Sequence, residues 1–181
     1  MGAKVVKFEI VQFSGARIIG KTTRVKEPTT LDDLTVNDLI DMMEKEGHYE
    51  FLLNLSNKFK QTSDTVGWQG DYNPGDTSYV YLVGVMFKPD TLVPIGYDYR
   101  DIKPCEMAVA WIQEFDGDEG GDLFGDASSN LAKVRDEHGY TYDGSNGFFE
   151  MEYYSEERFK IPQKQSKGVV LDFYSPCRKI E

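Results

Sequence analysis

The sequence lacks the features that mark membrane-spanning and exported proteins. It contains no apolar run of about 18 residues, the length that a helix needs to cross a bilayer. Residues 1–7 lack the apolar middle of a signal peptide. Only two cysteines occur, Cys105 and Cys177, and neither stands in a metal-binding or redox motif. We therefore expect a cytoplasmic protein with reduced thiols and no membrane association.

Positive charge is also scarce. Twenty Lys and Arg residues face 31 Asp and Glu residues, which gives a formal net charge of -11. Binding to a phosphate backbone depends on Lys and Arg that displace counterions, so we expect no direct nucleic-acid partner. A cleft in such a protein concentrates cations, because its low-dielectric walls focus the field of the acidic groups. The charge favours a small organic ligand, cationic or neutral. We expect a monomer or weak dimer.

Motifs for metals and common cofactors are missing. Asp116-Gly117-Asp118 begins a segment that resembles a calcium loop, but its twelfth position is Ala127, where a bidentate glutamate is required. The glycines do not form a dinucleotide loop or a phosphate loop, and no Gly-x-Ser-x-Gly motif occurs. We predict no metal and no cofactor.

What the chain does contain is a regular hydrophobic pattern over 181 residues, enough for one domain spanning 1–181. A Thr35–Asp38 capping box predicts a first helix up to Gly47, and a second helical piece, or a continuation of the first past Gly47, is predicted to run to about Lys58. A further helix is predicted over residues 123–138. Period-two alternation and turn residues predict extended segments over 8–13, 16–25, 65–72, 79–88, 97–103, 107–115, 148–159 and 168–178.

The order of these elements repeats. Extended segment, helix and hairpin occur twice, and an offset of about 91 residues aligns Ile18 with Val109. At an offset of about 89, Leu82 aligns with Leu171. The pattern predicts a duplicated unit in an antiparallel-rich α+β domain, with helices against one face of the sheet.

The segment 148–154 carries the most informative chemistry. Strand alternation places Glu150, Glu152 and Tyr154 on one face and apolar side chains on the other. Carboxylates beside aromatic rings suit a pocket for an amphipathic ligand, although the same pattern also fits a solvated sheet face. Alternation leaves open whether Glu150 or Glu152 points into such a pocket.

Aromatic residues are frequent on the predicted strands, among them Trp68, Tyr81 and Trp111. Large rings commonly fill cores, so each of them has a structural explanation. Together with a carboxylate they could also form a cage for a cation, since each ring contact contributes on the order of 0.5 to 2 kcal/mol.

Several motifs resemble one family across nearly the whole chain. The most specific is Glu152-Tyr153-Tyr154 followed by Arg158-Phe159, Pro162 and Val169 to Tyr174. Thr65 to Trp68 leading into Tyr81 to Val85, and Pro94 to Tyr97 leading to Ala108 to Trp111, support it. In these stretches the chain resembles the GyrI-like small-molecule-binding proteins, which are related to the effector-binding domains of AraC-type and MerR-type regulators.

The resemblance implies duplicated strand-helix-strand-strand units, half-repeats of about 4–90 and 95–180, related by pseudo-twofold symmetry with a ligand cleft between them. It implies an antiparallel-rich curved sheet with helices on one face. It also carries the cleft glutamate of the family to Glu152, with Glu150 as the competing candidate. Tyr154, Trp68, Trp111 and Tyr81 are then expected to bind the ligand or line the cleft.

Three functions are compatible with this resemblance. The first is a standalone binding protein that senses or sequesters an aromatic or cationic organic compound. The second is a hydrolase of strained cyclopropane-containing compounds, with Glu152 as a general base that activates water. The third is an inhibitory protein-binding module. Because no DNA-binding domain accompanies the predicted fold, we do not expect direct control of transcription.

Overall fold

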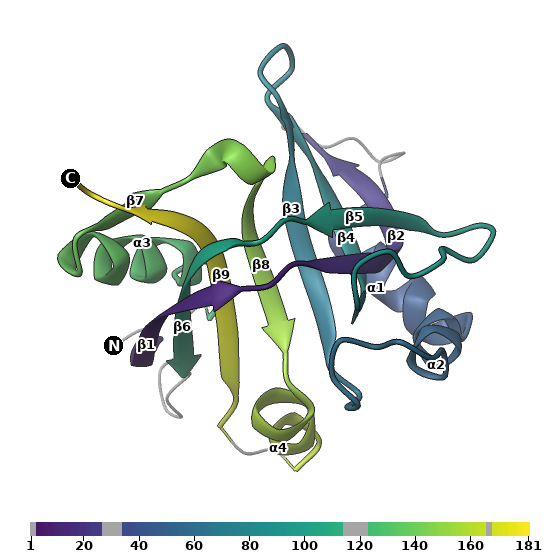
Figure 1. Cartoon of the computed structure of the whole chain (residues 1–181). Helices are drawn as coiled ribbons and strands as arrows, with labels where there is room; N and C mark the ends of the chain where they lie inside the picture. Colours follow the sequence, from purple (N-terminus) through teal and green to yellow (C-terminus); the bar gives the residue numbers. More distant parts are fainter. Residues whose placement is uncertain (1–2, 27–33, 114–122, 166–167) are drawn as a thin grey trace.

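The computed structural model describes residues 3–26, 34–113, 123–165 and 168–181, arranged around one curved antiparallel sheet (Figure 1). The acidic segment Asp116–Asp122 lies outside the described residues. The strands are β1 (Lys4–Phe13), β2 (Ala16–Val25), β3 (Thr65–Asn73), β4 (Ser78–Phe87), β5 (Asp98–Ile102), β6 (Cys105–Gln113), β7 (Tyr140–Tyr142), β8 (Phe148–Tyr154) and β9 (Val170–Lys179). The helices are α1 (Val36–Lys45), α2 (His48–Leu53), α3 (Ala127–Glu137) and α4 (Ile161–Lys164), with the short turns η1 (Gly144–Asn146) and η2 (Glu156–Lys160).

The sheet consists of two equivalent sets of strands that exchange their edges. Its order is β1-β6-β9-β8-β3-β4-β2-β5, and β7 adds to β9. β3 pairs with β8 at the centre, while β1 pairs with β6 and β5 pairs with β2. Each set therefore receives its edge strand from the other. The predicted α+β class with duplicated units and pseudo-twofold symmetry is confirmed.

One predicted alignment of the repeat matches residues that lie on opposite faces of the sheet. Ile18 and Val109, aligned at the larger offset, belong to one buried cluster. Leu82 belongs to that cluster too, but Leu171 belongs to the cluster on the opposite face of the sheet. Because side chains alternate along a strand, an alignment that is one residue out of register exchanges the two faces.

The helices cover one face of the sheet. α1 and α2 pack on β2 and β4 through Leu39, Met43 and Leu52, and α3 packs on β6 and β9 through Ala127 and Leu131. These side chains have exposures of 1% or less, so both helical layers are firmly seated. The helices therefore stand on either side of the central β3–β8 pair (Figure 1).

The first helical region begins as predicted and ends earlier. The Thr35 side chain accepts a hydrogen bond from the Asp38 N–H, and the Asp38 carboxylate accepts one from the Thr35 N–H, both at 3.1 Å. Gly47, at φ 75°, separates α1 from α2. The second helical piece predicted after Gly47 is present as α2, but it ends at Leu53 and not near Lys58, which forms a β-bridge with Phe87.

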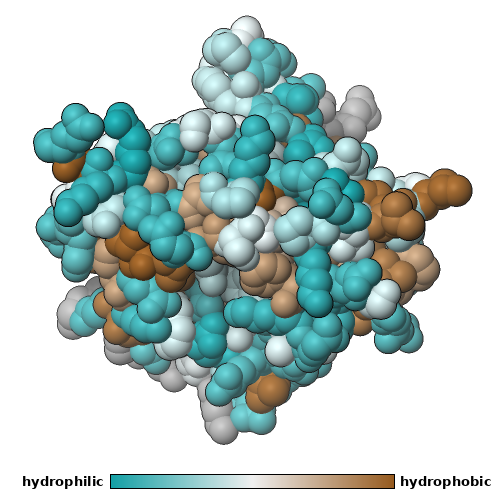
Figure 2. Space-filling view, in the orientation of Figure 1, coloured by the Kyte–Doolittle hydropathy of each residue, from teal (hydrophilic) through white to brown (hydrophobic). Residues whose placement is uncertain are grey.

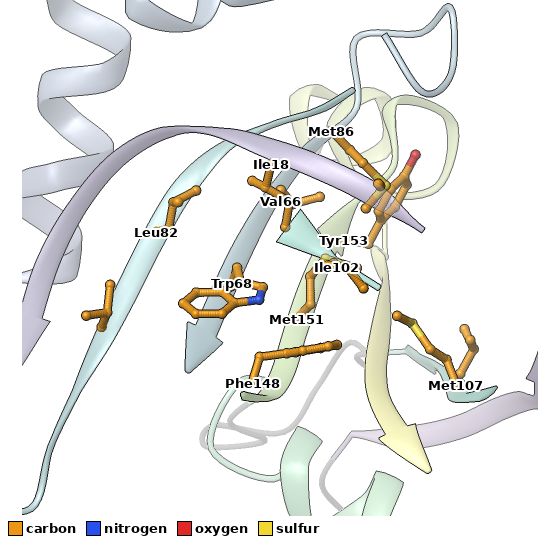
Figure 3. Packing of buried hydrophobic residues seen from close by; sticks show 13 residues of the cluster. Ile18, Val66, Trp68, Leu82, Met86, Ile102, Met107, Phe148, Met151 and Tyr153 are labelled. Atoms are coloured by element: carbon orange, nitrogen blue, oxygen red, sulfur yellow. The ribbon is translucent and has the colours of Figure 1, made fainter. Parts of the chain in front are cut away.

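The opposite face of the sheet is covered by its own edge strands. β1 and β5 cross in front of the central strands (Figure 1), and the cluster between them contains Ile18, Val66, Leu82 and Met151 among others (Figure 3). All four are 1% exposed or less. The outer surface of this side is mostly hydrophilic (Figure 2). In the described residues no helix is long and apolar enough to cross a membrane.

Candidate functional site

The carboxylate of Glu152 lies at the centre of the sheet on the helix-covered face. Glu152 is opposite Gly67 in the pairing of β8 with β3, and only 8% of the residue is exposed. The Tyr81 hydroxyl donates to its Oε2 at 2.5 Å, and the Tyr154 hydroxyl donates to the same oxygen. The Gln69 amide donates to Oε1 at 3.4 Å. Three neighbouring strands, β4, β3 and β8, thus converge on one carboxylate.

A glycine makes this convergence possible. A β-carbon at residue 67 would lie 2.3 Å from the Tyr81 hydroxyl oxygen and 3.0 Å from Glu152 Oε2. Real β-carbons do not approach other atoms as closely as the first of these distances, so a side chain at this position would displace Tyr81. Gly67 leaves the space in which the Tyr81 hydroxyl meets the carboxylate.

Burial dominates the electrostatics of this cluster. It raises the pKa of Glu152, while the hydrogen bonds from Tyr154 and Tyr81 oppose the rise and the charge of Glu150 adds to it. The pKa values of Tyr81 and Tyr154 are raised by burial and by the nearby carboxylate, so both hydroxyls remain donors at neutral pH. Among the described residues Glu152 forms no ion pair.

Glu150 lies on the same face and nearer to α3. The Ser128 hydroxyl of α3 donates to its Oε1, and burial raises the pKa of Glu150 as well. Alternation therefore placed both carboxylates correctly on one face. The contacts that distinguish them are two tyrosine hydroxyls for Glu152 and the Ser128 hydroxyl for Glu150, and of these Tyr81 and Ser128 come from other elements.

A cleft of about 510 Å³ opens beside this cluster, between the α1–α2 pair and the segment of η2 and α4. Tyr154 links the two, because its ring lines the cleft and its hydroxyl binds Glu152. Phe159 packs edge-on against the Tyr154 ring at 5.0 Å between centroids, and Phe124 lies at 6.5 Å. The remaining lining residues are Ile40, Glu44, Tyr49, Thr65, Val83, Lys160, Gln163 and Lys164.

Trp68 and Trp111 do not reach this cleft. Both side chains belong to the opposite face of the sheet: Trp68 packs on Phe148 in the buried cluster, and Trp111 lies between Lys7 and Arg158. For Trp68 the reason is the alternation of side chains along β3. Gly67 faces the helices, so the adjacent Trp68 must face away from them. Of the residues predicted for the site, the structure brings together Glu152, Tyr154 and Tyr81, with Glu150 beside them.

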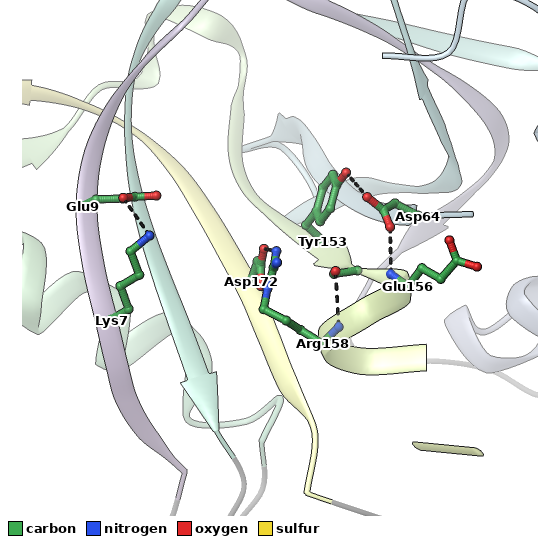
Figure 4. Close-up of polar contacts among 8 residues, drawn as sticks. Lys7, Glu9, Asp64, Tyr153, Glu156, Arg158 and Asp172 are labelled. Carbon is green, nitrogen blue, oxygen red and sulfur yellow. Dashed lines mark hydrogen bonds and ion pairs between the residues drawn. The ribbon is translucent and has the colours of Figure 1, made fainter. Parts of the chain in front are cut away.

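A polar network holds the η2 wall of the cleft in place. The Asp64 carboxylate accepts from the Glu156 N–H at 2.7 Å and from the Tyr153 hydroxyl at 2.5 Å. Arg158 donates to both oxygens of Asp172, which is 1% exposed (Figure 4). These contacts fix the turn at its start and at its middle. Phe159 and the residue after it are consequently presented to the cleft.

The strand predicted over 148–159 is longer than the observed strand. The prediction therefore missed the helical turn that forms one wall of the cleft. β8 ends at Tyr154, and Ser155 caps η2 by accepting a hydrogen bond from the Arg158 N–H at 3.4 Å. Phe159 and Lys160 therefore lie on a helical turn and not on the strand. The Ser155-Glu156-Glu157 sequence was the signal available, since serine followed by acidic residues is typical of a helix start.

No cluster of three or more His, Cys, Asp or Glu side chains within the described part of the chain is placed to hold a metal ion. The cleft is instead lined by aromatic rings, aliphatic side chains and a few charged groups. Such a lining is typical of a site for an organic ligand.

Comparison with known proteins supports this geometry at the level of the fold. No protein-family model matches the sequence, and no curated protein matches it. Among solved structures, the protein SAV2435 bound to tetraphenylphosphonium superimposes with a TM-score of 0.62 at 9% identity, over 96% of this chain and 94% of that one.

Two further structures agree. The C-terminal domain of EcmrR superimposes with a TM-score of 0.58 at 10% identity, over 96% of this chain and 98% of that one. An integron cassette protein from the mobile metagenome of Vibrio cholerae gives a TM-score of 0.54 at 13% identity, over 98% of this chain and 100% of that one. The chain thus has the GyrI-like fold that its sequence motifs predicted.

Proposed function

We propose that the protein binds an aromatic or cationic organic compound in the cleft beside Glu152, in order to sense or sequester it. The observation that carries this proposal is the carboxylate itself. Glu152 is 8% exposed, accepts hydrogen bonds from Tyr81 and Tyr154, and has no cationic partner among the described residues. A buried carboxylate is costly unless it is paired, so a positively charged ligand would supply what the protein lacks.

The shape and lining of the cleft suit such a ligand. Its volume of about 510 Å³ falls within the usual range of small-molecule pockets, roughly 300 to 1,000 Å³. Tyr49, Phe124, Tyr154 and Phe159 offer ring faces and edges to an aromatic compound, and rings attract a cation as well. Recognition of this kind needs no activated nucleophile.

One structural neighbour supports the same class of ligand. SAV2435, which shares this fold, was solved bound to tetraphenylphosphonium, a lipophilic aromatic cation. We therefore choose tetraphenylphosphonium as the first probe for this protein. Its binding tests charge recognition and aromatic packing at once.

Glu152→Gln is the decisive substitution, because it removes the charge and keeps the size of the side chain. We expect the affinity for tetraphenylphosphonium, measured by isothermal titration calorimetry, to fall by roughly 1 to 3 kcal/mol. Glu150→Gln removes the same charge from the same face two residues away, and we expect a smaller loss. Unchanged affinity in Glu152→Gln, or an equal loss in both variants, would exclude Glu152 as the centre of the site.

One observation favours hydrolysis as a second candidate function. A glutamate whose pKa is raised by burial, held by two tyrosine hydroxyls, has the chemistry of a general base that activates water. Incubation with a cyclopropane-bearing alkylating compound would then yield a ring-opened, hydrated product detectable by mass spectrometry. An equal rate of product formation with Glu152→Gln would rule this mechanism out.

A further inference from the structure

The wall of the cleft formed by η2 and α4 carries amines. Lys160 and Lys164 both line the cleft, together with the amide of Gln163. Lys160 is the more enclosed of the two lysines, since it is partly buried beside Phe159 and Lys164 is exposed. The cleft of this acidic protein therefore contains a local positive charge, and the Glu152 carboxylate lies beside it behind Tyr154.

The ammonium group of Lys160 is incompletely partnered. Its Nζ donates to the Ser63 carbonyl at 2.6 Å and lies 5.8 Å from the centroid of the Tyr49 ring. No carboxylate of the described residues forms an ion pair with it. An ammonium has three donors, and only one hydrogen bond of Lys160 is present here. The remaining donors are available to an acceptor in the cleft.

Lys160 and Glu152 are separated by aromatic rings. Tyr154 binds Glu152 through its hydroxyl, its ring packs on Phe159 at 5.0 Å, and Lys160 follows Phe159 in the chain. The carboxylate is bonded to the Tyr154 hydroxyl, and Lys160 lines the same cleft as both rings. An aromatic ligand packed against these rings would lie between the two charged groups.

We propose that the ligand of this cleft is a zwitterionic aromatic compound, whose carboxylate or similar anionic group binds Lys160 while its cationic part faces Glu152. This inference rests on the proposed function, since it assigns the chemical class of the ligand at the same site. The anionic group would accept a charge-assisted hydrogen bond from the Lys160 ammonium. Lys164 would add attraction at the rim.

A matched pair of dyes tests this directly. Rhodamine 6G is a cationic ethyl ester, and rhodamine 19 is its free acid with the same aromatic cation and an added carboxylate. Affinities for the whole chain are measured by fluorescence anisotropy at pH 7. We expect the free acid to bind about tenfold more tightly than the ester, the size of effect expected for a charged hydrogen bond.

Substitutions assign this preference to one side chain. Lys160→Met is expected to bring the acid-to-ester affinity ratio close to one. Lys160→Arg keeps the charge and is expected to keep the preference. Lys179→Met removes the same charge from the exposed end of β9 and serves as the matched control, with the preference intact. Circular dichroism of each variant confirms that it is folded.

A pH series gives an independent readout. The pKa of Lys160 is lowered to about 8, chiefly by burial and also by the charge of Lys164, while Asp64, Glu156 and Glu44 oppose the change. The preference for the acid should therefore be present below pH 8 and be lost above it, as the ammonium loses its proton. In Lys160→Arg it should persist above pH 8, because a guanidinium stays charged.

The outcomes separate this inference from the function on which it rests. If the ester binds in a Glu152-dependent manner but the acid gains nothing, or if the gain survives in Lys160→Met, the inference is overturned and the proposed function stands. If neither dye binds although tetraphenylphosphonium does, only the inference is overturned; if none of the three compounds binds, both are overturned. A tenfold preference that disappears only in Lys160→Met supports both.

Discussion

At the scale of single residues, the site depends on where hydroxyl groups point. Tyr81 from β4 and Tyr154 from β8 donate to the same oxygen of Glu152, and Gly67 leaves room for the first of them. Hydrogen bonds of this kind stabilise the charged form of the carboxylate, whereas burial destabilises it. The protonation of Glu152 is therefore set by two opposing effects that substitutions can separate.

Tyr81→Phe should change the pH dependence of ligand binding. Binding of a cation requires the charged carboxylate, so the affinity of the wild-type protein should fall as the pH drops through the raised pKa of Glu152. Removing the Tyr81 hydroxyl removes a bond that lowers this pKa, so the midpoint should move to a higher pH. Tetraphenylphosphonium titrations between pH 4 and pH 8 measure it.

The control for this prediction is Tyr72→Phe, which removes a hydroxyl from an exposed position of the β3–β4 hairpin. Its midpoint should equal that of the wild-type protein. A midpoint that stays in place in Tyr81→Phe would show that the short contact with Glu152 does not influence its protonation.

Some residues of the site follow from sequence patterns, and others do not. Alternation put Glu150, Glu152 and Tyr154 on one face, because that rule depends only on local backbone geometry. Tyr81 was expected near the cleft, and its contact with Glu152 follows from the pairing of β3 with both β4 and β8. Trp68 could have been assigned to the other face, since it adjoins Gly67, but only after the register of β3 was known.

At the scale of elements, the η2 turn decides how the cleft is closed on one side. Arg158 of this turn pairs with Asp172 of β9, and its guanidinium lies 4.3 Å from the centroid of the Trp111 ring. The pair links the wall of the cleft to the sheet. Its two partners differ in burial, since the Asp172 side chain is 1% exposed and that of Arg158 is 25% exposed.

Arg158→Met should destabilise the protein markedly. It leaves the Asp172 carboxylate buried without a partner, an arrangement that costs about 3 to 5 kcal/mol in fully buried pairs. Because the arginine is partly exposed, we expect a loss near or below the lower end of that range, measured by urea unfolding. Lys45→Met, which breaks the exposed pair with Asp41 on α1, is the matched control and should leave the unfolding midpoint nearly unchanged.

An unaltered midpoint in Arg158→Met would contradict the anchoring role of this pair.

The elements themselves were largely predictable: the capping box of Thr35 and the β3–β4 hairpin both follow from local sequence signals. The two failures differ in kind. Lys58 bridges to the distant Phe87, a contact that no local pattern shows. Ser155 begins η2 through a local capping signal that the predicted strand overlooked.

At the scale of the whole molecule, the exchange of β1 and β5 ties the two sets of strands together. β1 adds to β6, β5 adds to β2, and β3 pairs with β8 in the middle. We propose that residues 1–181 form one domain built from two half-repeats, neither of which completes its own sheet. Such an arrangement should unfold as a single cooperative unit.

The two tryptophans allow this to be tested, because Trp68 lies in the first set of strands and Trp111 in the second. In Trp111→Phe the remaining indole reports on the first set, and in Trp68→Phe it reports on the second. Within each variant, the fluorescence and circular dichroism transitions in urea should coincide. Non-coincident transitions in either variant would show that the two sets unfold separately.

The repeat was visible in the sequence as an order of elements, and its strand exchange was not. Offsets near 90 residues align equivalent strands, but they carry no information on which strands pair. Pairing β1 with β6 depends on a bend at Gly15, with φ at 94°, that turns the chain away from its neighbour. Ser14-Gly15, between the extended segments 8–13 and 16–25, allows such a bend, but its direction cannot be read from the sequence.

The central claim is that Glu152 recognises the positive charge of a ligand in the cleft. A crystal structure of the complex with tetraphenylphosphonium measures this directly. We predict the cation between Tyr49, Phe159 and Tyr154, with Glu152 as the nearest carboxylate. A cation held on the opposite face of the sheet near Trp68 or Trp111, or with Glu150 as its nearest carboxylate, would contradict the account.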